Sequence, residues 1–345
     1  MNPAISIIIP AWHEEEVIGM TLDALKELDY PLKECELIVV DDHSTDKSAS
    51  IMRDFAKVYD NILLLNQKAG KKGPAAARNL GIMHAKGEFI ASTDADESMF
   101  SDWLSRSIPY FSSLKVAAVG SLLIEQHPLD EGLSPKIQSI LIDNAKKPGI
   151  VSAGSTIYRK KALQEIGCFN ELCVFNDLDV DMHYRMIDKG YILKPIKNLA
   201  GQHKQRHNLQ AFYRRMKGFG AAGLIISFLN FKKAFSSSYK NKKGVLEYNI
   251  LALFIASFVL LTAIAAYFSI KTAFLIMIST FLVVFLISSI IAIARIGSAK
   301  ANMFYFPGVL VYVMVKWLAI LHGVFFGAFY YFNNNSKLGA LNENS

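Results

Sequence analysis

Short apolar runs alternate with amphipathic stretches through the first hundred residues of the chain. Four such runs predict buried strands, at residues 5–9, 37–40, 62–65 and 89–93. Pro10 is expected to close the first strand, and Glu14, Glu15 and Glu16 to occupy the first turn of the helix that follows. Four strands alternating with helices predict an α/β fold with a mainly parallel sheet.

The composition changes near residue 249, where the chain becomes mostly leucine, isoleucine, phenylalanine, alanine and valine. Apolar runs at 249–270, 272–294 and about 303–332 are each long enough to cross ~30 Å of hydrocarbon, which takes about 20 helical residues. We therefore expect about three transmembrane helices. Pro307 and Lys316 interrupt the third run, which could be tilted or re-entrant.

These patterns divide the chain into four parts. Residues 1–207 are expected to form a globular domain, 208–247 amphipathic helices and a basic linker, 248–332 the transmembrane helices, and 333–345 a polar tail. In the second part, apolar and aromatic side chains recur at helical spacing between basic ones. This pattern is typical of helices in a membrane interface, and packing against the globular domain is the alternative.

The basic residues predict how the chain is oriented in the membrane. Five lysines precede the first long apolar run, at positions 232, 233, 240, 242 and 243, whereas only Lys271 lies between the first and second runs. The positive-inside rule then predicts a multi-pass protein of the cell membrane whose N-terminal domain faces the cytoplasm. The net charge of +7 is explained by this membrane-facing stretch. We expect no nucleic-acid partner, because the globular part has no basic helix with interleaved aromatics.

Two smaller features concern the compartment and the start of the chain. Cys35, Cys168 and Cys173 form no metal-binding pattern and suit a reducing compartment. The first residues combine neither a basic segment nor a long apolar one, so no signal peptide is expected.

The most informative stretch is Asp94-Ala95-Asp96, directly after the fourth predicted strand. Residues i and i+2 at the end of a strand point the same way, so both carboxylates can face one spot. Two anionic oxygen donors suit Mg²⁺ or Mn²⁺ bridged to a diphosphate. A solvated acidic turn is the alternative for this motif taken alone.

Polar residues also follow the other three predicted strands. They are Trp12 and Glu14, Asp41 and Asp42, and Gln67 and Lys68. Because ligands of parallel α/β sheets bind at the carboxyl ends of the strands, this set predicts one site at that edge. The first turn lacks Gly-x-Gly-x-x-Gly, so a dinucleotide cofactor is not expected.

Four segments together resemble the successive signatures of family 2 glycosyltransferases with the GT-A fold. They are Ser-Ile-Ile-Ile-Pro-Ala-Trp-His-Glu-Glu from residue 6, Val-Val-Asp-Asp-His-Ser-Thr-Asp from 39, Gly-Pro-Ala-Ala-Ala-Arg-Asn-Leu-Gly from 73, and Asp-Ala-Asp from 94. The resemblance covers about the first 220 residues and implies a Rossmann-like catalytic domain. One departure is Trp12-His13, where the family usually has Tyr-Asn.

The resemblance also implies a role for each matching residue. Pro10, Ala11, Trp12 and Glu14 would line the base and ribose of a nucleotide sugar, and Asp41 or Asp42 would bond uracil or another base. Lys68, Arg78, Asp94 and Ala95 complete the expected nucleotide-sugar site, and Asp96 would bind the metal together with Asp94. Helix capping is the alternative for Asp42 and Thr45, and a surface salt bridge is the alternative for Arg78.

The acceptor half is expected further along, after a strand at 116–120. Small residues around Gly154 and Ser155 would let a substrate approach the backbone closely, and a simple turn is the alternative. The stretch from Asp177 to Arg185 is similar to the family block Glu-Asp-x-Asp-Leu-x-x-Arg-Leu. In that register Asp179 is the catalytic base and Leu178 stands where Glu is usual.

Two further carboxylates lie near Asp179. A shift of two residues would offer Asp177 as the base instead, and Asp181 is expected to pair with Arg185 along one helix face. His203 matches a histidine that several family members use as a further metal or diphosphate ligand, and imidazole suits Mn²⁺ better than Mg²⁺. A surface histidine in a basic loop is the alternative.

The resemblance therefore implies a membrane-anchored, metal-dependent, inverting glycosyltransferase. Its partners would be a UDP- or GDP-linked sugar donor, a lipid-linked or surface glycan acceptor, and membrane lipid. The alternatives are a polyprenyl-phosphate sugar synthase and a catalytically inactive GT-A domain that serves as a membrane scaffold. A sugar-nucleotide-forming nucleotidyltransferase would need a basic, glycine-rich loop after the first strand, where this chain is acidic.

Overall fold

The computed structural model describes two separate parts of the chain. The first comprises residues 4–31, 34–57, 61–70, 73–120, 124–125, 151, 154–171, 178–196 and 202–203. The second comprises short stretches and single residues between 209 and 329. These parts belong to two compact units, which are described separately below.

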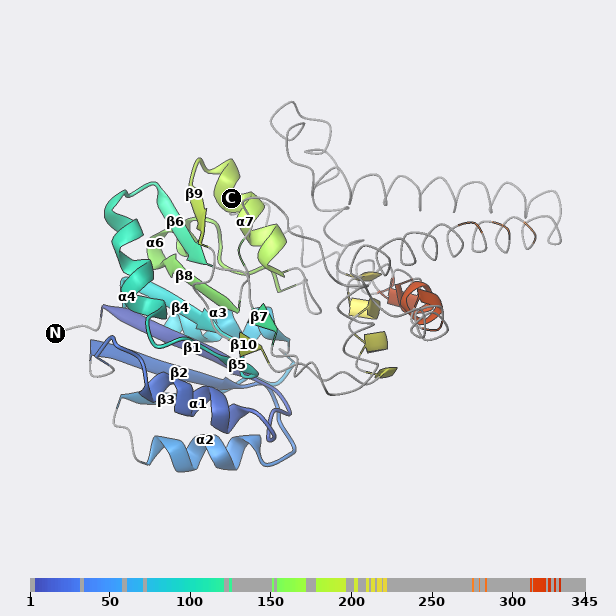
Figure 1. Cartoon of the computed structure of the whole chain (residues 1–345), viewed down its shortest axis with the longest axis horizontal. Coiled ribbons are helices and arrows are strands. Elements are labelled where there is room, and N and C mark those ends of the chain that lie inside the picture. Colours follow the sequence, from blue (N-terminus) through green and yellow to red (C-terminus); the bar gives the residue numbers. More distant parts are fainter. Residues whose placement is uncertain are drawn as a thin grey trace, which may run out of the picture. The chain divides into compact units, whose positions relative to one another are not determined.

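The first unit consists of strands and helices that alternate along the chain (Figure 1). Its strands are β1 (Ile5–Ala11), β2 (Cys35–Asp41), β3 (Ile62–Asn66), β4 (Phe89–Thr93), β5 (Glu97–Ser98), β6 (Val116–Gly120), β7 (Ile124–Glu125), β8 (Ser155–Arg159), β9 (Ile192–Pro195) and β10 (Gln202–His203). Its helices are α1 (Ile18–Lys26), α2 (Ser48–Ala56), α3 (Pro74–His84), α4 (Trp103–Ser107), the 3-10 helix η2 (Ile108–Ser112), α6 (Lys160–Glu165) and α7 (Leu178–Asp188).

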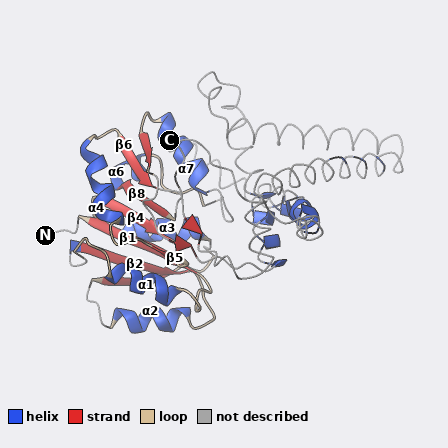
Figure 2. Ribbon diagram, viewed as in Figure 1, coloured by secondary structure: helices blue, strands red, loops and turns tan. Residues whose placement is uncertain are grey.

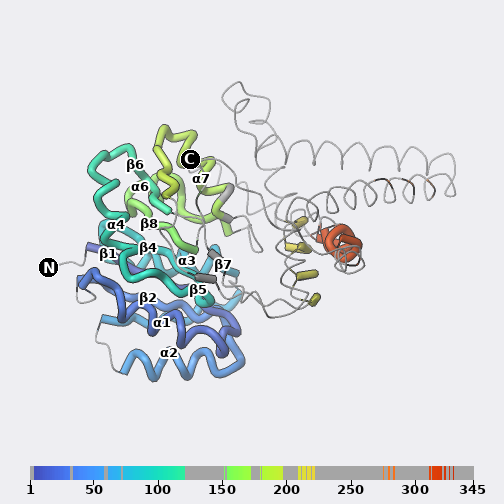
Figure 3. Tube along the Cα trace, viewed as in Figure 1, coloured from blue at the N-terminus to red at the C-terminus, as the bar shows by residue number. Residues whose placement is uncertain are grey.

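Seven strands form one sheet in the order β3-β2-β1-β4-β8-β6-β9. In Figure 3, the blue β1 and β2 lie on one side of β4, and the green β8 and blue-green β6 lie on the other. The pairs among β1 to β4 are parallel, as is the pair of β6 with β9. The expectation of an α/β fold with a mainly parallel sheet is therefore confirmed.

The sequence did not predict β8, which runs antiparallel to both β4 and β6. Alternating side chains place the residues of a strand on two faces, but they carry no information on its direction. The antiparallel direction brings the start of β8, at Ser155, beside the end of β4, at Thr93. This pairing places Gly154, directly before β8, at the edge where the polar turns gather.

Helices cover both faces of the large sheet, which explains why its strands are continuous apolar runs (Figure 2). On one face, Ile5, Ile7 and Ile9 of β1 belong to a core that also includes side chains of α1, α2 and α4. On the other face, α3 packs on β1, and Gly81 lies so close to Ile8 that a Cβ would overlap that side chain.

Two expectations about the first strand and helix are wrong. Pro10 does not close β1 but lies inside it, in register with Val40 of β2. The first helix begins at Ile18, so the acidic residues precede it rather than occupy its first turn. The Glu15 carboxylate accepts a hydrogen bond from the backbone N–H of Lys47, 2.9 Å away, and so joins the two polar turns.

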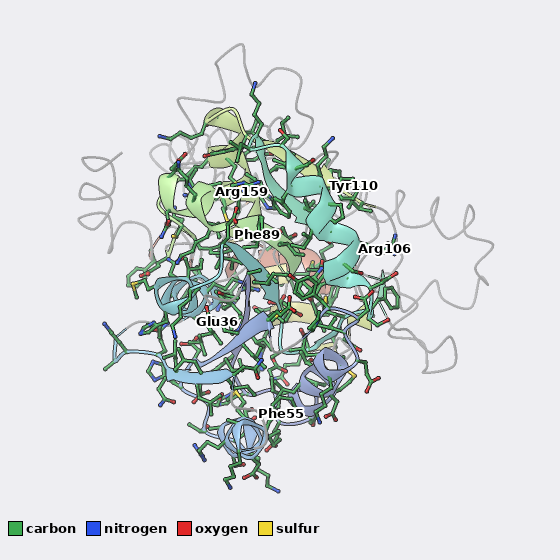
Figure 4. All side chains as sticks on the ribbon, turned by 90° about the vertical axis from the view of Figure 1, so that its left-hand side faces the viewer. Glu36, Phe55, Phe89, Arg106, Tyr110 and Arg159 are labelled. Atoms are coloured by element: carbon green, nitrogen blue, oxygen red, sulfur yellow. The ribbon has the colours of Figure 1, made fainter. Side chains whose placement is uncertain are left out.

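The opposite end of the sheet is held by Arg159, the last residue of β8. Its guanidinium donates to Glu88 and to the carbonyl of Phe111, and it lies over the rings of Phe89 and Phe111. Figure 4 shows Arg159 and Phe89 close together at this end. Phe89 is the first residue of β4, whereas Asp94 follows its last residue. The cluster around Arg159 therefore stabilises the end of the sheet opposite to the polar turns.

In the second unit, the described parts of residues 209–221 and 311–329 are helical and contact each other. The Tyr213 hydroxyl lies 2.6 Å from His322 Nδ1, and the Lys217 ammonium lies 4.5 Å from the centre of the Phe326 ring. Gly323 faces the carbonyl of Lys217 with no room for a Cβ. Among the described residues, no helix is both long enough and apolar enough to span a bilayer. Most of the three predicted transmembrane segments lies outside the described residues.

Candidate functional site

The polar turns predicted from the sequence meet at one edge of the sheet. Ala11 of β1 pairs with Asp41 of β2, which pairs with Asn66 of β3, so these strands end level with one another. The backbone pairing continues beyond the strands, because Asp42 N–H donates to Ala11 and Gln67 N–H donates to Asp41, at 2.8 and 2.9 Å. Parallel strands that end together form the usual ligand edge of an α/β sheet.

Trp12 presents an exposed aromatic ring at this edge. Its side chain is 57% exposed and stacks on the His13 ring, with centroids 4.7 Å apart. His13 has a left-handed backbone, with φ of 55°, and its N–H donates to Ser44 Oγ at 3.1 Å. Its Nε2 lies 3.0 Å from Thr45 Oγ1. Ser44 and Thr45, in the turn after β2, thus hold His13 in place, and His13 stacks on the Trp12 ring. The exposed face of that ring could stack on a planar ligand.

Asp42 contacts Gly73, the N-cap residue of α3. Its Oδ2 accepts a 2.6 Å hydrogen bond from Gly73 N–H, and its Oδ1 is buried without a hydrogen-bond partner among the described residues. Gln67 Nε2 is a buried donor that also has no hydrogen-bond partner among the described residues. A nucleobase edge offers both a donor and an acceptor, and buried polar groups that lack partners are costly.

Helix capping does not explain the β2 turn. At the start of α2, Ser48 N–H donates to the Asp46 carboxylate at 3.0 Å, and the Thr45 hydroxyl is engaged with His13. Neither Asp42 nor Thr45 therefore caps α2.

Arg78 joins α3 to the end of β4. It is only 2% exposed, its Nε donates to Ser92 Oγ at 3.0 Å, and its Nη2 forms an ion pair with Asp94 Oδ1. The alternative of a surface salt bridge is wrong, because the guanidinium is buried. A buried cation beside the motif carboxylate suits a site for an anionic ligand.

Three carboxylates cluster in the turn after β4. Asp94 and Asp96 are half-buried, and Glu97, which follows them, is fully buried. Burial raises the pKa of Glu97 well above its usual value, and the negative charges of Asp94 and Asp96 raise it further. The turn is held in place by the Thr21 hydroxyl, which donates to the Ala95 carbonyl at 2.7 Å.

Gly154 packs directly against this carboxylate cluster. A Cβ at this position would overlap both Asp94 Oδ2 and Glu97 Oε1. The Glu97 Oε2 oxygen accepts from Asp94 N–H at 3.3 Å, whereas Oε1 is buried without a hydrogen-bond partner among the described residues. Gly154 thus lies against the carboxylates of Asp94 and Glu97, and the approach of a substrate to its backbone stays a prediction.

The chain also brings His203 to the turn after β4. In the small sheet β5-β10-β7, His203 of β10 pairs with Glu97 of β5, directly after Asp96. The His203 side chain lies outside the described residues. Among the described side chains, no three His, Cys, Asp or Glu groups converge as a formed metal site. The donor set nevertheless fits a divalent cation, which would relieve the repulsion among clustered carboxylates.

Asp179 lies in the first turn of α7 and is half-buried. Its negative charge reaches the buried hydroxyl of Tyr158 on β8, whose pKa is raised first by burial and then by Asp179. Arg78 and Asp94 act on the same hydroxyl, with opposite signs. The candidate base and the metal motif therefore lie around one buried group.

The neighbouring carboxylates on α7 are distinguished by their contacts. Asp181 is buried and accepts from Arg185 Nε at 2.8 Å, which confirms their predicted pairing. Asp177 lies outside the described residues. Asp181 thus forms its ion pair within α7, whereas the charge of Asp179 raises the pKa of Tyr158 on β8.

The remaining predicted residues lie at the same edge with varying exposure. Pro10 and Ala11 are buried in β1, and Ser155 is buried at the start of β8. Glu14 is half-buried, and its N–H donates to Ser48 Oγ at 2.8 Å. Lys68 is exposed after β3.

Sequence reasoning missed three residues of the site: Ser92, Glu97 and Tyr158. The acidic residue after Asp-x-Asp was visible as a signal for Glu97. The others acquire their role only through contacts across the sheet.

Comparison with known proteins agrees with this geometry. Residues 6–167 match the model of the glycosyl transferase family 2. Glycosyltransferase AglE of Haloferax volcanii is 29% identical over 208 residues, which cover 59% of this chain and 68% of that protein. The beta-monoglucosyldiacylglycerol synthase of a Nostoc species is 30% identical over 188 residues, or 52% of this chain. The alignment spans only 40% of the Nostoc protein's length.

A solved structure shares the fold. The Pyrobaculum calidifontis mannosyltransferase PcManGT, in complex with GDP-Man and Mn²⁺, superimposes with a TM-score of 0.58 at 20% identity. The match covers 93% of this chain and 88% of that one. Residues 6–167 of this chain are therefore similar to the glycosyl transferase family 2 model, and the fold is similar to that of the mannosyltransferase.

Proposed function

We propose that this protein is a metal-dependent, inverting glycosyltransferase that moves a sugar from a nucleotide donor to an acceptor at a membrane. The observation that carries the proposal is the grouping of Arg78, Asp94 and Asp179 around Tyr158. It joins a buried cation, a carboxylate of the metal motif and a candidate base. A transferase needs these three elements together.

The donor nucleotide would bind across the ends of β1 to β4. The exposed Trp12 ring offers a stacking surface, and Asp42 Oδ1 and Gln67 Nε2 offer an acceptor and a donor to the base. Buried Arg78 places positive charge beside the motif carboxylate Asp94. The structural neighbour binds GDP-Man, and we take a UDP- or GDP-linked sugar as the donor here.

The metal would be held by Asp96 with Asp94 and His203, and Mn²⁺ or Mg²⁺ suits these donors. When bound, such a cation supplies positive charge beside the departing diphosphate. Two neighbouring residues support this turn. Glu97 accepts a hydrogen bond from Asp94 N–H, and Gly154, which has no Cβ, leaves room beside it for the carboxylates of Asp94 and Glu97.

The transfer itself would use Asp179 as the base. Its carboxylate takes the proton of the acceptor hydroxyl as that oxygen attacks the anomeric carbon. A new carbon–oxygen bond forms, while the bond to the diphosphate breaks and its electron pair leaves with the nucleoside diphosphate. Attack from the face opposite the leaving group inverts the anomeric centre.

The acceptor is proposed to be a lipid-linked glycan or another glycan at the membrane surface. The long apolar runs after residue 248 favour a membrane location, with the catalytic domain in the cytoplasm. The Nostoc relative is named for a glycolipid product, which agrees with a lipid acceptor.

Release of nucleoside diphosphate tests this proposal. The purified full chain would be incubated with UDP-glucose, UDP-N-acetylglucosamine or GDP-mannose, Mn²⁺ and a membrane-lipid extract. We expect turnover with one donor, loss of turnover when Mn²⁺ is chelated, and loss in Asp96→Ala. Absence of both turnover and binding across a wider panel of sugar nucleotides would favour a non-catalytic scaffold.

A further inference from the structure

A buried contact joins Tyr158 to His183 near the candidate base, and the function described so far gives His183 no role. Tyr158 and His183 are both fully buried, and the Tyr158 hydroxyl lies 3.3 Å from His183 Nε2. The Tyr158 ring also packs edge-on against Phe169, with centroids 6.2 Å apart. Two fully buried polar side chains cost stability unless their hydrogen bonds are used.

His183 and Asp179 belong to the same face of α7. They are four residues apart in this helix, which is the spacing of neighbours along one side. Tyr158 approaches this face from β8, where Thr156 and Tyr158 alternate with Ile157. A residue that contacts His183 in this way lies next to the turn that carries Asp179, in agreement with the effect of Asp179 on Tyr158.

The protonation of His183 follows from its surroundings. Burial and, to a smaller extent, the nearby Arg185 lower the pKa of His183 to about 3, so the imidazole is neutral. Its Nδ1 is buried without a hydrogen-bond partner among the described residues. An unpaired buried N–H is rarer than an unpaired acceptor, so we assign the proton to Nε2. In that tautomer His183 donates to the Tyr158 oxygen.

The Tyr158 hydroxyl proton is then directed elsewhere. Thr156 also forms a side-chain hydrogen bond that favours negative charge on the Tyr158 oxygen, so Thr156 is a second donor to it. With two donors on its oxygen, Tyr158 must donate its own proton to an acceptor. The negative charges that act on this hydroxyl come from Asp179 first and from Asp94 to a smaller extent.

We propose that Tyr158 and His183 are positioning residues for the base Asp179, with His183 fixing the Tyr158 hydroxyl and Tyr158 directing its proton to the carboxylate. This role rests on the proposed transferase function. A hydroxyl that donates to a carboxylate stabilises its ionised form and restricts its rotation. Asp179 would therefore be ionised and oriented before the acceptor arrives.

Other charged groups around Asp179 bear on the pH dependence that this role predicts. Arg78 of α3 and Asp94 after β4 face the same buried hydroxyl. On α7 itself, Asp181 is paired with Arg185, and His183 is neutral. The Arg78–Asp94 and Asp181–Arg185 pairs do not include the Tyr158 hydroxyl, so a change in the pH profile when only this hydroxyl is removed reports on the hydroxyl.

The test compares the full-length wild type with Tyr158→Phe, His183→Leu and His183→Gln, using the donor that wild type turns over. Tyr158→Phe keeps the ring against Phe169 and removes only the hydroxyl. We expect about a tenfold lower kcat with an unchanged donor KM. Its acidic limb is expected to move up by about one pH unit.

His183→Leu is expected to behave like Tyr158→Phe, and His183→Gln to recover activity because the amide keeps an N–H donor. A merely structural role would lower thermal stability in all three variants without moving the pH profile. Wild-type kcat and pH profile in both Tyr158→Phe and His183→Leu would overturn the positioning role alone. An inactive wild type that binds no donor would instead overturn the transferase, and this role with it.

Discussion

Arg78 and Asp94 form an ion pair that joins α3 to the turn after β4, and the buried guanidinium also donates from Nε to Ser92 Oγ. The pair orients Asp94 from below the turn, while the opposite oxygen of Asp94 faces Gly154. The Arg78 guanidinium is buried and therefore held in place by the fold. The Asp94 carboxylate is partly exposed and therefore accessible to a ligand.

Removal of this guanidinium should reduce activity more than stability. Arg78→Ala is expected to lower kcat/KM by about 100-fold, because the site loses a preorganised positive charge. Arg78→Lys should recover only part of this, since one ammonium cannot reproduce the planar fork between Ser92 and Asp94. Steady-state kinetics and thermal unfolding measure both effects.

The matched control for this prediction is Arg106→Ala. Arg106 pairs with Asp102 across an exposed surface of α4, at 3.2 Å, and such pairs contribute about 0–1 kcal/mol. Wild-type kinetics are expected in this variant. Equal losses in Arg78→Ala and Arg106→Ala would argue against a specific role for the Arg78–Asp94 ion pair.

A methyl group at Gly154 should disturb the carboxylate cluster. Its Cβ would overlap Asp94 and Glu97, so we expect Gly154→Ala to raise the Mn²⁺ concentration for half-maximal activity by about tenfold or more. Gly19→Ala is the control, because a Cβ on Gly19 of α1 would meet no other atom within 4 Å. Similar Mn²⁺ dependence in the two variants would contradict the assignment.

The two tryptophans among the described residues of the first unit should separate binding from stability. Trp12 is 57% exposed at the ligand edge, so Trp12→Ala is expected to raise the donor KM about tenfold with little change in Tm. Trp103 is fully buried in α4, and Trp103→Ala should cost about 3–5 kcal/mol of folding stability. A donor KM unaffected by Trp12→Ala would remove this ring from the site.

The stability of the domain should fall in acid because of His183. Burial lowers the pKa of this imidazole from its ordinary 6.5 to about 3, so the unfolded chain binds the proton more readily. Stability is therefore full above about pH 6.5 and is lost as the pH falls toward 3, by roughly 1.4 kcal/mol per pH unit. Chemical unfolding between pH 7 and 5 measures this slope.

His183→Gln should flatten that slope, because it removes the titrating group and keeps a polar side chain of similar size. His84→Gln provides a control on an exposed histidine at the end of α3. An identical slope in wild type and His183→Gln would show that other groups control the acid sensitivity.

The sequence was sufficient to predict β1 to β4 and the polar turns at their ends. Strands buried on both faces are continuous apolar runs, and their carboxyl ends are marked by Trp12, Asp42 and Asp94. The strand limits were less well predicted. Pro10 has no N–H to donate, yet it lies inside β1, because the pairing with β2 continues past it to Ala11.

The sequence was not sufficient to predict the direction of β8 or the contacts that depend on it. Tyr158 and His183 are separated by 25 residues and meet only because β8 lies antiparallel between β4 and β6. The close approach of Gly154 to Glu97, which leaves no room for a Cβ on Gly154, arises from the same pairing. Such contacts follow from tertiary structure, which local spacing does not encode.

The most direct test of the central claim compares Asp179→Asn with Asp181→Asn in a single-turnover transfer assay. Both changes replace a carboxylate on α7 by an isosteric amide. The account predicts that Asp179→Asn binds the sugar nucleotide as wild type does and loses at least about 1,000-fold in transfer rate. Asp181→Asn should lose the contact to Arg185 and some stability, yet retain measurable transfer. Transfer at the wild-type rate by Asp179→Asn would contradict its role as the base.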